Sequence, residues 1–205
     1  MAFDVRALAI ATAGFSAFVN LYSPQALLPE LAREFGVGAG EISMLITAST
    51  LAIALTAPFT GALADVLGRK RLITAAAFAV IVPTLIIALS SSVPQLVFWR
   101  FVQGLLLPPI FTVAVAYVGE EWPPAEVPRV VGLFISGSSV GGFCGRFFTG
   151  VIADLVGWRA AFAAIALFTL AGALIITFAL PRERKFVRSG GFLLSARQML
   201  AHLHN

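Results

Sequence analysis

Two arginines lie inside stretches of the sequence that are otherwise apolar. Arg100 is surrounded by FWRFVQGLLLPP, and Arg146 lies in GLFISGSSVGGFCGRFFTG. Placing an arginine in a membrane helix costs on the order of 2.5–3.5 kcal/mol, so it usually faces a cavity or a polar partner. Gln103 lies three residues after Arg100 and shares its helix face. We therefore expect Arg100, Gln103, Gly104 and Arg146 to serve coupling or to line a cavity.

Other polar residues could serve the same cavity. The first apolar stretch ends in FVNLYSPQALLPELAREF, which places Asn20, Tyr22 and Gln25 among apolar neighbours. These side chains suit a substrate cavity, although single residues of this kind equally form hydrogen bonds between helices. Arg100 also has an alternative to a position in the cavity. It lies six residues after Pro94, so its side chain could reach the membrane surface.

Acidic residues are missing from the interior of the apolar stretches. The nearest carboxylates lie at their ends, at Glu30, Glu41, Asp65, Glu120, Glu121 and Asp154. A proton site usually needs a carboxylate whose pKa a low dielectric can raise. Any such site must therefore use an acid at the membrane surface or one from elsewhere. Two arginines without acids predict an anionic substrate group, or a carboxylate that another half supplies.

The composition requires that lipid, rather than water, surrounds most of the chain. Of its 205 residues 59% are hydrophobic and 12% are charged, and the mean hydropathy is +0.94. A soluble domain carries about 25% charged residues. A helix needs roughly 20 apolar residues to cross a bilayer. We predict an all-α membrane protein with a six-helix bundle over residues 1–181, its spans at about 7–29, 42–64, 72–89, 94–119, 130–153 and 160–180, followed by a basic cytoplasmic linker over 182–205.

Basic residues predict the orientation of the helices. With the N-terminus in the cytoplasm, ten of the fourteen basic residues fall inside, Arg33 and Arg159 fall outside, and two lie in the membrane. Cytoplasmic loops of membrane proteins carry such an excess of Lys and Arg. We expect a multi-pass protein of the cell inner membrane with both termini in the cytoplasm. The net charge of +4 thus indicates membrane topology, and no nucleic-acid partner is expected.

The sequence contains a weak internal repeat. GALADVLGRKRLITAAAF from Gly61 is similar to GVIADLVGWRAAFAAIAL from Gly150, so Asp65 aligns with Asp154 and Gly68 with Gly157. Each copy joins the second helix of a triplet to the third, and an odd number of helices inverts the second triplet. We interpret the match as a 3+3 inverted repeat, a device of transporters; the alternative is chance similarity of Gly- and Ala-rich sequence.

The loop GALADVLGRKRL resembles the signature loop of the major facilitator superfamily, G-x-L-A-D-x-x-G-R-K. The sequence R-x-x-Q-G at Arg100 is similar to the family's second motif. The resemblance covers the whole chain but only the N-terminal half of a twelve-helix fold, so it implies a second six-helix half on the same or another chain. It also implies that the loop takes part in gating; the alternative is that the loop only fixes the topology. The loop residues are Gly61, Leu63, Asp65, Gly68, Arg69 and Lys70.

Glycines follow one face of the fifth predicted helix. Gly137, Gly141 and Gly145 are spaced by four, a pattern that lets two helices pack closely. The family's antiporters often carry G-P-x-x-G-G here, but Gly142 stands at the proline position and Arg146 replaces the last glycine. Helix packing is therefore the expected role of these four glycines.

Motifs for enzymatic chemistry are absent: the sequence has no HExxH, Walker loop, GxSxG or Cys/His cluster, and its single cysteine allows no internal disulfide. We expect no enzyme, no cofactor and no metal. The resemblance is greatest to drug and sugar efflux permeases, which implies proton-coupled efflux of a small organic compound. Two alternatives remain, uptake of a small anionic metabolite and a non-transporting or truncated half that needs a partner. The expected partners are a small-molecule substrate, protons, the lipid bilayer and the second half.

Overall fold

The computed structural model describes residues 4–183, and this part of the chain is almost entirely helical. Six segments are long and apolar enough to cross a membrane. This confirms the predicted all-α fold with six spanning helices. The segments are Val5–Phe35, Ala39–Leu67, Arg69–Ala88, Val93–Glu121, Val127–Val156 and Trp158–Ala179.

Prolines break several of these segments into shorter helices. Proline has no backbone N–H and so interrupts the hydrogen-bond ladder of a helix. Pro24 lies in a 3₁₀ turn of the first segment, Pro83 lies in the third, and Pro108 begins a new helix in the fourth. The helices are α1 (Val5–Tyr22), η1 (Ser23–Leu27), α2 (Leu28–Phe35), α3 (Ala39–Ile42), α4 (Met44–Leu67), α5 (Arg69–Ala79), α6 (Ile81–Ala88), α7 (Val93–Leu106), α8 (Pro108–Glu121), α9 (Val127–Val156) and α10 (Trp158–Ala179).

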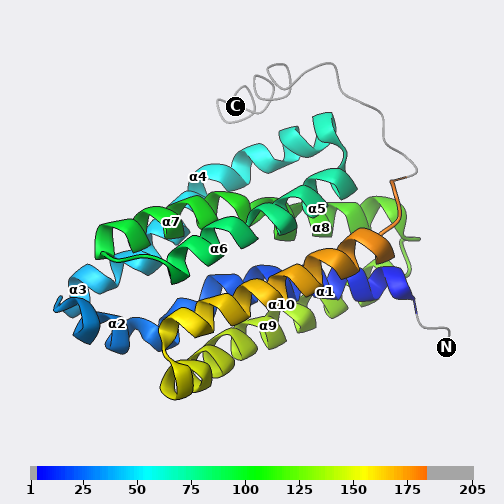
Figure 1. Ribbon diagram of the computed structural model, residues 1–205. Coiled ribbons are helices and arrows are strands. Elements are labelled where there is room, and N and C mark those ends of the chain that lie inside the picture. The colour runs from blue at the N-terminus through cyan, green and yellow to red at the C-terminus, as the bar shows by residue number, and fades with distance from the viewer. Residues whose placement is uncertain (1–3, 184–205) are drawn as a thin grey trace.

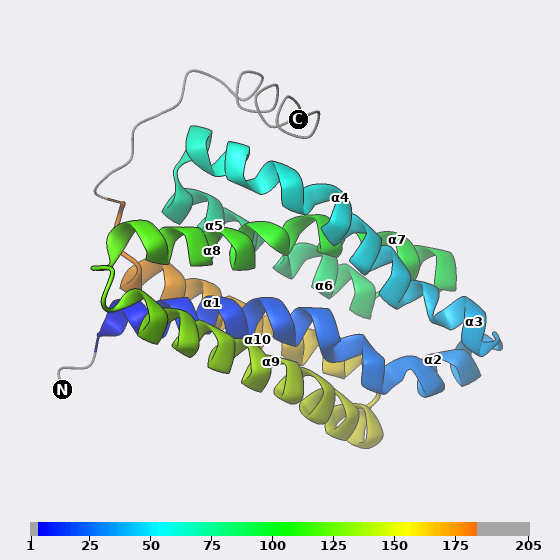
Figure 2. The same ribbon diagram turned by 180° about the vertical axis from the view of Figure 1, so that it is seen from behind.

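The helices form two layers (Figure 1). One layer holds α1, α9 and α10, and the other holds α4, the pair α5 and α6, and the pair α7 and α8; the view from behind shows the same grouping (Figure 2). Apolar side chains from both layers form the core between them, among them Ile10, Ile73, Ile110 and Ile176, which are fully buried.

Two glycines show the inverted repeat in the backbone. Gly68 has φ 90° and ψ 141°, and Gly157, 89 residues later, has φ 90° and ψ 159°. Each ends one long helix and directly precedes the next, in a conformation that only glycine adopts readily. The turn between α4 and α5, at Gly68, lies at the end of the bundle where α1 begins and α10 ends, which we call the terminal end; the turn between α9 and α10, at Gly157, lies at the other, distal end (Figure 1).

Helices α4 and α9 are the least covered by the rest of the chain. In their most apolar windows 22% and 28% of the residues are buried, against 44–56% in the other four segments. Large apolar side chains are exposed on both helices, such as Leu55 and Phe59 on α4 and Phe143 and Phe147 on α9. These faces are available to lipid or to a second bundle.

Candidate functional site

Arg100 lies at the centre of a buried polar network. Its side chain on α7 is fully buried and donates five hydrogen bonds, all to uncharged acceptors. The acceptors are the backbone carbonyls of Leu45 (3.4 Å), Asn20 (3.1 Å) and Leu21 (3.2 Å), the Ser49 hydroxyl (2.9 Å) and the Gln103 amide oxygen. Hydrogen bonds to a charged group contribute about 1.5–3 kcal/mol each. Arg100 therefore faces polar partners inside the bundle and does not extend to the membrane surface, and its role in coupling stays a prediction.

Pro24 explains why a backbone carbonyl is available to Arg100. In a continuous helix the N–H of residue 24 would bond to the carbonyl of Asn20, but proline has no N–H. The carbonyl of Asn20 therefore accepts from Arg100 and, at 3.2 Å, from the Ser23 hydroxyl. The break in the first membrane segment thus provides an acceptor for the buried cation.

Gln103 and Asn20 extend this network to other helices. The Gln103 amide nitrogen donates to Asn20 Oδ1 at 3.0 Å and to the Thr84 hydroxyl of α6 at 2.7 Å. The Asn20 side-chain nitrogen donates to the Thr169 hydroxyl of α10 at 2.7 Å. The network therefore connects α1, α4, α6, α7 and α10. Of the two roles that the sequence left open for Asn20, the structure shows the hydrogen bonds between helices.

Gly104 places α7 directly against α4. A Cβ atom at Gly104 would lie closer than 3.0 Å to the Ser49 carbonyl oxygen and to Ala52. Because Ser49 also accepts from Arg100, this close packing brings α4 into the polar network.

The glycine stripe of α9 packs on α1. A Cβ atom at Gly137, Gly141 or Gly145 would lie closer than 3.0 Å to a backbone carbonyl oxygen of α1, at Ala11, Phe15 and Val19 respectively. The matched spacing of four on both helices creates a seam along which the two backbones touch, the geometry expected of small residues in membrane helices.

A groove of about 350 Å³ lies between α1 and α9, beside this seam. Arg146 is exposed in it, and its guanidinium lies 4.0 Å from the ring centroid of Tyr22. Arg146 Nε donates to the Gln25 amide oxygen at 2.7 Å, and Nη1 donates to the Gly142 carbonyl at 3.1 Å. The structure thus brings together Tyr22, Gln25 and Arg146, and separates them from Asn20 and Arg100. The groove is lined by Phe18, Tyr22, Phe134, Ile135, Ser138, Ser139, Gly142 and Arg146.

At the terminal end, Arg69 connects two helices. It contacts Asp65 Oδ1 at 3.4 Å and forms a bidentate ion pair with Glu120 at the end of α8. The turn at Gly68 places Arg69 in the first turn of α5, from which its side chain reaches α8. Sequence reasoning did not identify Glu120 as a partner, because no local spacing relates it to Arg69.

The other predicted loop residues have separate environments. Leu63 is partly buried against the core, and the Lys70 backbone N–H donates to Glu183 at 3.3 Å. Gly61 is exposed, and a Cβ atom there would meet no atom within 4 Å. Among residues 4–183, Gly61 therefore makes no close contact with another helix, because this face of α4 points away from the bundle.

The distal end holds a second pair of the same kind. Arg159, two residues after Gly157, contacts Glu34 at 2.8 Å, and the Trp158 indole donates to the same carboxylate. In both repeats a basic residue after the positive-φ glycine pairs with a glutamate at the end of the first helix of the other triplet. The ion pairs therefore follow the inverted repeat.

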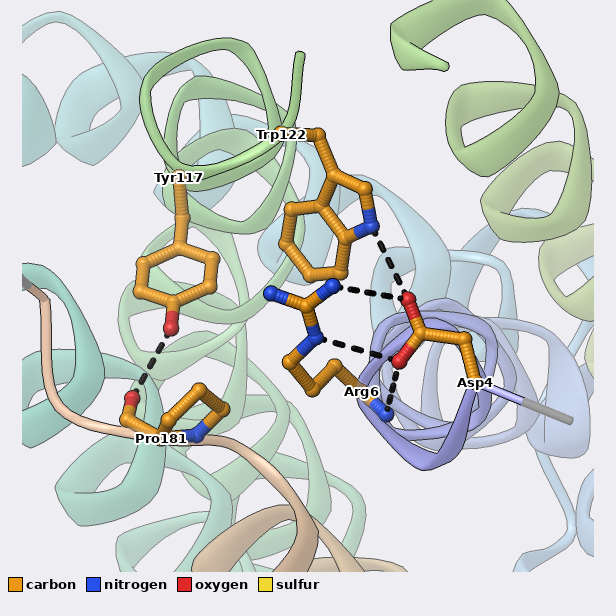
Figure 3. A network of polar contacts seen from close by, with 5 residues as sticks. All are labelled: Asp4, Arg6, Tyr117, Trp122 and Pro181. Carbon is orange, nitrogen blue, oxygen red and sulfur yellow. Dashed lines mark hydrogen bonds and ion pairs between the residues drawn. The ribbon is translucent and has the colours of Figure 1, made fainter. Parts of the chain in front are cut away.

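A third polar cluster joins the start of α1 to the end of α8 (Figure 3). Asp4 accepts from the backbone and side chain of Arg6 at 3.0–3.1 Å and from the Trp122 indole at 3.1 Å. Nearby, the Tyr117 hydroxyl donates to the Pro181 carbonyl at 2.8 Å. Burial alone would raise the pKa of Asp4, but the hydrogen bonds from Arg6 and Trp122 hold it below its usual 3.8.

Known proteins are similar to this chain in sequence and in fold. Residues 10–195 match the family model of the Major Facilitator Superfamily. The chain is 38% identical to the inner membrane transport protein YnfM of Escherichia coli K12 over 179 residues, which is 87% of this chain and 43% of that protein. Weaker similarity extends to the 4-hydroxybenzoate transporter PcaK of Pseudomonas aeruginosa (29%; 85% and 39% covered) and to the multidrug export protein EmrB of Escherichia coli K12 (25%; 75% and 30% covered).

The structure of the proton:xylose symporter XylE superposes with a TM-score of 0.78 at 15% identity, over 96% of this chain and 48% of that one. The chain spans less than half the length of the curated relatives named above. The similarity in sequence, the six apolar helices and the inverted repeat agree with one another. The chain is a multi-pass membrane protein and belongs to the major facilitator superfamily of transporters.

Proposed function

We propose that the chain is one six-helix half of a secondary transporter that moves a small organic compound across a bacterial inner membrane. The observation that supports this most directly is the groove between α1 and α9, where Tyr22, Gln25 and Arg146 meet on an exposed face. Alternating access requires one bundle to move against another around a central site. The groove would be this chain's share of that site, and a second half would supply the rest.

The terminal end is proposed to lie in the cytoplasm. It carries Arg69, Lys70, Arg71 and Arg182, whereas the described part of the distal end carries Arg33 and Arg159. Positive charge favours the cytoplasmic side. In this orientation the ion pairs of Arg69 with Asp65 and Glu120 would form a cytoplasmic gate.

Proton-coupled efflux is the proposed mode of transport. Within residues 4–183 the internal polar network contains Arg100 and neutral groups but no carboxylate. The titrating acid would therefore come from the second half or from the membrane surface. The relative EmrB is named a multidrug exporter, which supports the direction. Uptake of a small anion is the second candidate, supported by the exposed cation Arg146 and by the relative named a 4-hydroxybenzoate transporter.

Reconstitution with a second half would test this function. The chain would be placed in liposomes alone and together with the part of YnfM that lies beyond the matched region, with a pH-sensitive dye in the lumen. In proteoliposomes with an acidic lumen, adding substrate outside should raise the lumen pH by antiport only when both halves are present. A protonophore should abolish the signal. A fall in lumen pH upon substrate addition would instead indicate symport, and no substrate-dependent flux for a wide panel of compounds would refute the transporter proposal.

A further inference from the structure

Arg146 is a charge deep in the membrane without an acidic partner. It lies ten residues before the end of α9, about 15 Å at 1.5 Å per residue, within a segment that is long and apolar enough to cross a membrane. Within residues 4–183 it makes no ion pair, and its second terminal nitrogen, Nη2, has no hydrogen-bond partner. A charge in this position costs on the order of 2.5–3.5 kcal/mol. An anion bound in the groove would compensate it.

The guanidinium is held in a fixed orientation. Gln25 accepts from Nε, the Gly142 carbonyl accepts from Nη1, and the Tyr22 ring stacks beneath the plane at 4.0 Å. Gly142 leaves room for the ring, because a Cβ atom there would lie 3.0 Å from Tyr22 and the ring would have to shift by a few tenths of an ångström. These contacts use neutral groups, so they orient the charge without neutralising it. Nη2 remains available for a charge-assisted hydrogen bond, which is about twice as strong as a neutral one.

The groove is lined by aromatic side chains and by small residues. Phe18 and Tyr22 form a ring pair 5.9 Å apart, and Phe134 lies on the α9 side. A volume of about 350 Å³ is at the lower end of the range for ligand sites, roughly 300–1,000 Å³, which suits a compound with one ring. Ser138 and Ser139 donate their protons to their own helix, at 2.9 and 3.0 Å, so their oxygens remain available as acceptors.

We propose that this groove selects small aromatic carboxylates. The carboxylate would bind Nη2 of Arg146, the ring would pack against Phe18, Tyr22 and Phe134, and a ring hydroxyl would donate to Ser138 or Ser139. The inference rests on the proposed transport function and names its substrate class. It excludes cations, which Arg146 repels, and it ranks neutral compounds of the same shape below the anion, since they leave the charge uncompensated.

Fluorine NMR on the 205-residue chain in lipid nanodiscs provides the test. The probes are 4-fluorobenzoate and its neutral isostere 4-fluorobenzamide, whose line broadening reports weak binding. We expect 4-fluorobenzoate to bind at least about tenfold more tightly, and Arg146→Gln to remove this preference. Arg159→Gln is the matched control, because Arg159 also lies over an aromatic ring, 4.2 Å from Trp158, but at the distal end. It should leave the preference unchanged.

Three binding results would contradict the proposed substrate class. Equal binding of the two probes, no binding of either, or an unchanged preference in Arg146→Gln would overturn it. Circular dichroism of each variant shows whether the helices are retained. Proton-linked flux of a neutral or cationic compound without 4-fluorobenzoate binding would refute the substrate class and leave the transport function standing. Selective binding of 4-fluorobenzoate without flux of any compound would support the substrate class and refute the transport function.

Discussion

The seam between α1 and α9 predicts that one added methyl group separates two helices. In Gly141→Ala the new Cβ would lie closer than 3.0 Å to the carbonyl oxygen of Phe15. That oxygen belongs to the helix backbone and cannot rotate away, so α1 must shift and lose contacts along the seam. Overpacking of this kind costs about 1–3 kcal/mol. Alanine also favours a helix over glycine by about 0.5–1 kcal/mol, which offsets part of the loss.

Gly132 on the same helix provides the matched control. It is exposed, and a Cβ atom there would meet nothing within 4 Å. Gly132→Ala should therefore stabilise the chain by about 0.5–1 kcal/mol through helix propensity alone. Unfolding in mixed micelles of dodecylmaltoside and sodium dodecyl sulfate, followed by circular dichroism, gives both values. The two variants should differ by about 1–3 kcal/mol, the overpacking contribution. If Gly141→Ala unfolds at the same or a higher fraction of dodecyl sulfate than Gly132→Ala, the two helices do not touch as described.

Three further predictions concern the polar clusters. Gln103→Leu should lower stability by about 1–3 kcal/mol, since it leaves a buried N–H of Arg100 unsatisfied and removes one of the two donors to Asn20 Oδ1. The same unfolding assay should show almost no change for the exposed Thr50→Val, and matching midpoints would contradict the network. Asp4 has a pKa below its usual 3.8, so its contribution to stability is present above that pH and is lost as the pH falls through the lower, folded value. Asp4→Asn should flatten the dependence of thermal stability on pH in this acidic range, and superimposable curves for variant and parent would argue against the cluster in Figure 3. Glu120→Gln should change stability by less than about 1 kcal/mol, because its ion pair with Arg69 is partly exposed. It should nevertheless speed hydrogen exchange in the turn around Gly68 and leave exchange in the turn at Gly157 unchanged. Equal exchange in parent and variant would show that the ion pair does not hold the terminal end.

The fold was predictable because its determinants are local. Runs of about 20 apolar residues set the number of helices. The spacing of four between Gly137, Gly141 and Gly145 indicated a packing face, and the structure shows which helix it meets. The repeated glycines Gly68 and Gly157 indicated equivalent turns, and both have φ 90°.

The partners of the polar residues were not predictable, because they depend on contacts between distant segments. Asn20 and Tyr22 are two residues apart, yet one points into the bundle and the other into the groove, as the helix rotates about 100° per residue. Arg100 and Arg146 looked alike in sequence. Arg100 is surrounded by neutral acceptors, one of which is a carbonyl that Pro24 makes available, and Arg146 remains exposed.

The pair of equivalent turns bears on how such a fold could arise. A duplicated unit of three helices must insert once in each direction, and a glycine with φ 90° makes the same reversal on either side of a bilayer. The backbone of the turn therefore carries no information about direction, and only the side chains around it distinguish the two copies. Three consecutive cations follow Gly68, whereas a tryptophan and a single arginine follow Gly157. Divergence of charge after duplication would fix each copy in its own orientation, while the turn itself stays the same.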